Sequence, residues 1–149
     1  MEGDRSAEMS DDERDRFLGT GGTGVISFSA GADGPPYAVP VSYGYDPVTS
    51  RFYFRLAFGP ESGKRRVVGR PASFVVYGRT DAGWRSVRAT GTLEEVTEAA
   101  MDSDVVDAIR RVSIPLVDAF DRHPREVTFR FFRLLPDELT GRREAAEGE

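Results

Sequence analysis

The stretch YAVPVSYGYD (37–46), followed after a short turn by RFYFRLAF (51–58), alternates in side-chain character with a period of two residues. Such alternation is typical of β-strands, whose successive side chains point to opposite faces of a sheet. One face of the first run carries Val39, Val41, Tyr43 and Tyr45, and the other carries Ala38, Pro40, Ser42 and Gly44. The two runs therefore predict a β-hairpin with one apolar face and one bare face.

The bare face of the first strand has a consequence for binding. Pro40 cannot donate a backbone hydrogen bond, so it belongs at a sheet edge or at an interruption of the sheet. A strip of small side chains beside such an edge lets a planar ring lie against the backbone. Ser42 is the hydroxyl on this strip, and it can donate to a heteroatom of the ring.

The loop after the second strand predicts an anion site. GPESG (59–63) leads into a predicted helix over 61–69, whose first turn offers Ser62, Lys64 and Arg65. Backbone donors, a hydroxyl and cations at a helix start suit a phosphate group. Lys64 is the one lysine of the chain. Arg55, inside the second strand, is read either as a ligand contact or as half of a cross-strand ion pair.

The rest of the chain supplies more strands than helices. Strands are predicted over 24–29, 73–79, 84–96 and 127–134, and helices over 11–18 and 99–120. Ser10 and Glu13 form a capping box that begins the first helix. Pro115 is expected to kink or split the long helix. Six strands with short connections predict a mainly β fold, a small antiparallel barrel with a few flanking α-helices.

The chain of 149 residues suits one domain with a real core. We expect a disordered N-terminus over 1–9, a single domain over 10–139 and a charged tail over 140–149. The acidic start has no apolar run, which predicts neither a signal peptide nor a membrane span, and we expect a cytoplasmic protein.

Composition excludes several classes of function. The chain has no cysteine and one histidine, so disulfides, thiolate chemistry and multi-histidine metal sites are excluded. A net charge of −5 disfavours nucleic acid or an anionic membrane as the main partner. We find neither a Ser-His-Asp set nor a catalytic carboxylate pair. Trp84 is read as a core or interface aromatic residue, and His123 as a capping or surface residue.

Taken together, PYAVPVSYGYD (36–46), RFYFRLAF (51–58) with SGK (62–64), WRSVRATGTLEEV (84–96) and FRLLPDELTGR (132–142) resemble the pyridoxamine 5'-phosphate oxidase-like FMN-binding proteins. The smaller members of that family include relatives of the nitroimidazole-resistance reductases. The resemblance covers roughly residues 17–142. It implies a six-stranded antiparallel split β-barrel with Greek-key connectivity, assembled as a homodimer with FMN at the subunit interface.

The resemblance also implies roles for individual residues. Four residues of the first strand would run beside the isoalloxazine ring, two would follow on the neighbouring strand, and others would hold the phosphate or reach the flavin from a later strand. In chain order these are Val39, Pro40, Val41 and Ser42; Phe54 and Arg55; Ser62 and Lys64; and Ser86. The oxidase has an arginine where this chain has Val39, so Arg55 or Arg65 would have to replace that cation. Because the oxidase's C-terminal substrate segment is also missing, pyridoxamine phosphate is not inferred as the substrate.

These expectations leave more than one function open. The main hypothesis is an FMN-dependent oxidoreductase of unknown substrate, with a reduced nicotinamide as a candidate electron donor. The first alternative is a non-catalytic protein that stores, carries or senses the flavin. The second is a dimeric structural protein that has lost the flavin. Haem or a deazaflavin in place of FMN also remains open.

Overall fold

The computed structural model describes residues 6–29, 34–58, 70–97, 101–114 and 128–144. Seven strands and two helices lie in this part of the chain. In chain order they are β1 (Ser6–Glu8), α1 (Asp11–Leu18), β2 (Gly21–Phe28), β3 (Tyr37–Asp46), β4 (Arg51–Phe58), β5 (Pro71–Thr80), β6 (Gly83–Val96), α2 (Ser103–Arg111) and β7 (Thr128–Glu144). Among the described residues, no helix is long and apolar enough to cross a membrane.

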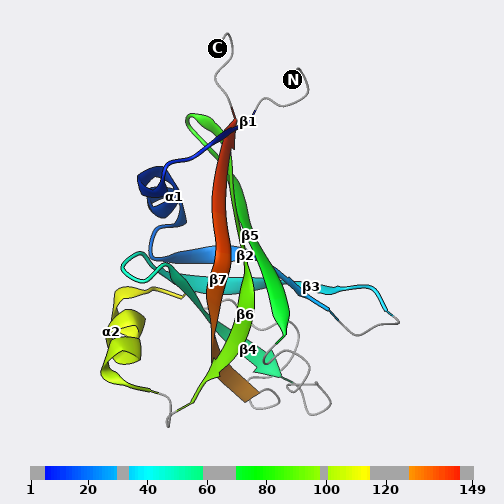
Figure 1. Ribbon diagram of the computed structural model, residues 1–149, viewed down its shortest axis with the longest axis vertical. Coiled ribbons are helices and arrows are strands. Elements are labelled where there is room, and N and C mark those ends of the chain that lie inside the picture. The colour runs from blue at the N-terminus through cyan, green and yellow to red at the C-terminus, as the bar shows by residue number, and fades with distance from the viewer. Residues whose placement is uncertain (1–5, 30–33, 59–69, 98–100, 115–127, 145–149) are drawn as a thin grey trace.

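The strands close into a barrel. All pairings are antiparallel, and the strand order β7-β4-β3-β2-β5-β6 returns to β7 through the long β6–β7 pairing. In Figure 1, β6 and β7 run side by side along the vertical axis while β2 and β3 cross behind them. The predicted mainly β, six-stranded antiparallel barrel with flanking helices is confirmed.

The alternation of the hairpin builds the barrel core. Tyr43 and Tyr45 point inward beside Phe52, Phe54 and Phe74, and all five side chains are buried. The ring of Phe74 packs edge-on against Tyr43, Phe52 and Phe54, with ring centroids 4.9–5.3 Å apart. Edge-to-face aromatic pairs of this kind contribute about 0.5–1.5 kcal/mol each beyond their buried area. The inner face of β3 is thus committed to the core.

The barrel is split between β3 and β4. These strands pair only over Tyr43–Asp46 and Arg51–Phe54. Residues 37–42 of β3 pair with β2 alone, and residues 55–58 of β4 pair with β7 alone. Pro40 lies on this one-sided part of β3, opposite Val25, so its predicted place at a sheet edge or interruption is confirmed.

Several predicted boundaries are wrong. Residues of the expected disordered N-terminus form β1, which pairs with Arg142–Glu144 of β7. The expected charged tail is a strand as far as Glu144, because it pairs with β1 on one side and β6 on the other. The first barrel strand begins at Gly21, earlier than predicted. The predicted helix over 61–69 lies outside the described residues.

The long helix predicted over 99–120 is also wrong in extent. Within the described residues it is α2, which ends at Arg111. Val112 is extended, and the Ser113 N–H donates to the Thr20 carbonyl oxygen at 2.9 Å. This contact with the segment before β2 draws the chain out of helical geometry, upstream of the proline expected to do so.

Candidate functional site

The candidate site is the split beside the first half of β3, where inner and outer side chains separate clearly. Val39 and Val41 are partly buried and pack against the barrel core, so they offer a ligand only their backbone. Pro40 is exposed on the opposite face. Phe54 is wholly buried in the core. Arg55 follows it on β4, half-buried, at the first residue where β4 no longer pairs with β3.

Ser42 is the unusual polar residue at the split. Its Oγ is buried and, within the described part of the chain, has no hydrogen-bond partner. Buried polar groups in proteins are normally paired, and an unpaired one costs about 1–3 kcal/mol. Ser42 lies where the ladder between β3 and β4 stops. An acceptor atom from a bound molecule at this position would satisfy the hydroxyl.

Not every residue of the predicted site lies near Ser42. Ser86 is on β6, opposite Tyr77, and β2 and β5 lie between β3 and β6 in the sheet. At about 4.8 Å per strand, Ser86 is roughly 14 Å away across the outer surface. The predicted phosphate ligands Ser62, Lys64 and Arg65 lie outside the described residues, as does His123.

The bare strip predicted on β3 is partly filled by the chain itself. A Cβ atom added to Gly44 would lie 2.6 Å from Val112 Cβ and 2.9 Å from Ile114 Cγ1. The segment after α2 therefore packs directly on Gly44, and only a residue without a side chain fits there. The open part of the strip is reduced to Ala38, Pro40 and the neighbourhood of Ser42.

An ion pair that the sequence did not reveal holds the end of this strip. The Asp46 carboxylate is buried and accepts from Arg111 Nε at 2.7 Å and Arg111 Nη2 at 2.8 Å. It also accepts from Thr49 Oγ1 and the Val48 N–H. Burial raises the pKa of Asp46, but these hydrogen bonds outweigh it and hold the pKa below its ordinary value. Asp46 thereby ties the β3–β4 turn to α2.

Two tyrosines tie the other face of β3 to α1. Tyr43 Oη donates to the Leu18 carbonyl oxygen at 2.9 Å, and Tyr45 Oη donates to Asp15 Oδ1 at 2.7 Å. Burial raises the pKa of both hydroxyls to about 12. They stay protonated at neutral pH and serve as structural donors rather than as acid–base groups.

The outer surface also carries exposed aromatic side chains. Tyr77 and Trp84, near the β5–β6 turn, are 63% and 48% exposed. They occupy outward-facing positions on neighbouring strands, where Tyr77 pairs with Ser86 and Trp84 pairs with Arg79. Trp84 is thus not a core residue in this chain; its interface reading remains a prediction.

The described residues offer little general acid–base chemistry at the split. They contain no group of three His, Cys, Asp or Glu side chains that could hold a metal ion. What the split offers is flat backbone on a one-sided strand, an exposed proline face and an unpaired hydroxyl. This arrangement suits binding of a planar molecule with ring heteroatoms better than it suits hydrolysis.

Comparison with known proteins gives a family and several structural neighbours. A family model described as pyridoxamine 5'-phosphate oxidase matches residues 10–143. An FAD-binding protein from Mycobacterium smegmatis superposes with a TM-score of 0.66 at 17% identity, covering 94% of this chain and 100% of that one. An FAD-binding protein from Mesorhizobium loti gives 0.62 at 21% identity, covering 92% and 96%. A candidate 5-nitroimidazole antibiotic resistance protein from Bacteroides thetaiotaomicron gives 0.57 at 18% identity, covering 92% and 86%. No curated protein matches the chain.

The Asp46 ion pair predicts a pH-dependent stability. Because the folded pKa lies below its ordinary value of 3.8, the unfolded chain binds more protons, and stability falls as the pH drops through this region. We expect Asp46→Asn to be less stable than the parent at pH 7, with a difference that shrinks as the pH falls toward the folded pKa. Urea unfolding at several pH values measures this, and Asp81→Asn, at an exposed turn, is the matched control. A stability difference that does not change with pH would contradict the assignment.

Proposed function

The chain belongs to the pyridoxamine 5'-phosphate oxidase family, and from this membership we propose that it binds a flavin at the split between β3 and β4. We propose further that the bound flavin makes it an oxidoreductase. The observation that carries the proposal is the buried Ser42 Oγ on the one-sided part of β3, which has no hydrogen-bond partner among the described residues. The structural neighbours described as FAD-binding proteins support the choice of a flavin.

The residues of the split fit an isoalloxazine ring. Its flat face would lie over the exposed Pro40 and the backbone of Val39 and Val41, whose side chains pack against the core. Ser42 Oγ would donate to a ring heteroatom and so gain the hydrogen bond it lacks. In this proposal Ser62, Lys64 and Arg65 hold the phosphate and Arg55 lies beside the ring, while Phe54 is buried in the core and Ser86 lies three strands away from Ser42.

The chain's own part in the reaction is to bind and orient. A bound flavin supplies hydride transfer, which needs access to one ring face and polarisation of the ring. Ser42 supplies the polarising donor, and the ring face turned away from Pro40 is left for a second planar molecule. The hydroxyls of Tyr43 and Tyr45 are engaged by α1, so neither serves as a proton donor. A reduced nicotinamide is the proposed electron donor.

We propose FMN as the flavin, as the family resemblance implies, with the predicted phosphate ligands directly after β4 in the chain. FAD carries the same ring and phosphate. Chromatography of the cofactor released on heating distinguishes FMN from FAD. A non-catalytic carrier or sensor remains the alternative function. A bound flavin that reduced nicotinamides leave oxidised would favour this alternative.

The first experiment measures flavin affinity. We expect Ser42→Ala to weaken FMN binding about two- to tenfold, since a neutral hydrogen bond contributes about 0.5–1.5 kcal/mol. Lys64→Ala is expected to weaken it by roughly tenfold or more, since charge-assisted bonds are stronger. Ser73→Ala, on the outer face of β5, is the control and is expected to bind FMN as the parent does. Parent-like affinity in Ser42→Ala, measured by fluorescence titration, would remove Ser42 from the site.

The second experiment separates enzyme from carrier. We expect anaerobic addition of NADPH or NADH to bleach the bound flavin, because hydride transfer to an accessible ring needs no titrating side chain. The rate is expected to depend little on His123, so His123→Ala serves as the internal control. A flavin that stays oxidised with both donors would favour the carrier or sensor function. Loss of bleaching in His123→Ala would overturn the mechanism while leaving flavin binding intact.

The third experiment concerns assembly, for which we propose a homodimer with the flavin at the interface. Tyr77 and Trp84 expose apolar area on one outer surface, which is the kind of surface that a second copy covers. Light scattering is expected to give twice the chain mass of 16.4 kDa. The double change Tyr77→Lys and Trp84→Lys is expected to shift the protein toward monomer. A flavin-loaded monomer at micromolar concentration would contradict the proposal.

A further inference from the structure

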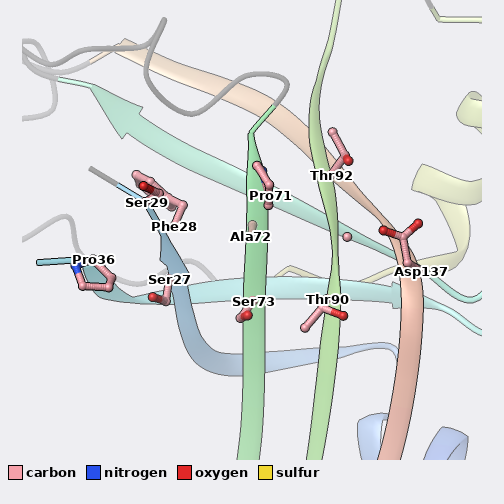
Figure 2. Close-up of a pocket in the computed structure, with 11 residues that line it drawn as sticks. Ser27, Phe28, Ser29, Pro36, Pro71, Ala72, Ser73, Thr90, Thr92 and Asp137 are labelled. Carbon is pink, nitrogen blue, oxygen red and sulfur yellow. The ribbon is translucent and has the colours of Figure 1, made fainter. Parts of the chain in front are cut away.

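An open cavity of about 400 Å³ lies on the outer surface of the barrel (Figure 2), and Ser27 at one end of it pairs with Ala38 of β3. It is formed by the ends of β2 and β5 and by the middle of β6 and β7. Its lining shares no residue with the predicted flavin set. A volume of this size is within the range of small-molecule sites in proteins.

The floor of the cavity is a row of hydroxyl groups. Ser27, Ser73 and Thr90 lie opposite one another on three neighbouring strands, β2, β5 and β6. Figure 2 shows the three side chains at the same level across these strands. With neighbouring strands about 4.8 Å apart, the row spans roughly 10 Å. Each hydroxyl can both accept and donate, so the floor can satisfy either kind of polar group.

A β-bulge places a carboxylate at the end of this row. Thr90 pairs with Glu138 and Gly91 with Pro136, so Asp137 is the extra residue on β7. In such a bulge the two opposed residues point to the same side, which turns Asp137 toward the cavity that it lines. Gly91 is required here, because a Cβ atom would lie 2.9 Å from Pro136 Cα and closer still to the Leu135 carbonyl oxygen.

The charge of Asp137 is not neutralised by the residues around it. Of the described residues that line the cavity, Asp137 alone is charged. It forms no ion pair within the described part of the chain. Glu138 beside it adds a second negative charge and accepts a long contact from Thr90 Oγ1, at 3.5 Å. Two arginines lie at the edges of the cavity: Arg88 is two residues from Thr90 on β6, and Arg70 donates to the carbonyl oxygen of Ser29, which lines the cavity at the end away from Asp137 (Figure 2).

The apolar walls complete the site. Phe28 lines the cavity and packs against Tyr37 with ring centroids 5.2 Å apart. Pro36 and Pro71 also line the cavity and offer surface to an alkyl chain. Two carboxylates and neutral hydroxyls are too few ligands for a metal cage. A primary ammonium group needs only three acceptors for its three N–H donors.

We infer that this cavity binds a small organic cation, a primary ammonium ion on a short alkyl or hydroxyalkyl chain. The ammonium group binds Asp137 and the Thr90 hydroxyl, the chain lies along the walls, and a distal hydroxyl reaches Ser27 or Ser73. The inference stands apart from the flavin proposal, since neither uses a residue of the other.

The experiment compares two probes of equal length on the full chain, aminopentanol and the neutral pentanediol, by following backbone amide signals in NMR titrations. At low ionic strength we expect the amine to bind about tenfold more tightly than the diol, as charge-assisted hydrogen bonds exceed neutral ones. The shifted signals should include Ser73 and Thr90. Asp137→Asn should bind both probes equally, and Asp81→Asn, at an exposed turn, should keep the preference.

Several results would overturn the inference. They are equal affinity of the parent for both probes, no binding of either, an undiminished preference in Asp137→Asn, or shifts confined to other strands. Because Asp137 is exposed and makes no described contact within the fold, its replacement by asparagine should leave the barrel folded, which the unshifted part of the same spectrum shows. Rising salt should reduce the preference for the amine in the parent.

Discussion

The structure depends on the point at which β4 loses one of its two neighbouring strands. β4 pairs with β7 from Phe52 to Phe58, but it shares only four residue pairs with β3. Beyond Phe54, β4 stays paired with β7 but no longer pairs with β3, so the two strands part and the barrel opens between them. The first half of β3 is left with β2 as its single neighbour. Pro40 is tolerated there because the edge of β3 that does not pair with β4 needs no backbone N–H donor.

The two halves of β3 are therefore held in different ways. The second half is fixed on both faces. Its tyrosines fill the core and bind α1, Gly44 is covered by Val112 and Ile114, and Asp46 is bound to Arg111. The first half has an inner face against the core and an outer face with little on it. A rigid half that positions an open half is a favourable basis for binding, because the ligand need not order the strand.

The outer surface of the barrel divides into regions of different chemistry. Ser42 and Pro40 mark the split, Tyr77 and Trp84 mark an aromatic region near the β5–β6 turn, and the hydroxyl row with Asp137 lies toward the other end of these strands. The aromatic region and the hydroxyl row occupy different residue pairs of the β5–β6 ladder, while the split lies on β3, where the ladder with β4 stops. The bulge at Asp137 interrupts that register and gives β7 two successive carboxylates on one side.

The sequence by itself determined the elements whose signal is local. Period-two alternation over 37–46 and 51–58 fixed the hairpin and its inward side chains, and the capping box at Ser10 and Glu13 fixed the start of α1. Pro40 predicted a sheet edge, because it cannot donate a backbone hydrogen bond. Only the tertiary structure decided that Thr140–Glu144 is a strand, because polar residues there look like a tail until β1 and β6 supply their hydrogen bonds. It also decided that Val112 and Ile114 cover Gly44 and that Asp46 binds Arg111, 65 residues away in the chain. The bulge that turns Asp137 toward the cavity is likewise visible only in the tertiary structure. These features arise from contacts between distant segments, and local periodicity carries no information about which segments will meet.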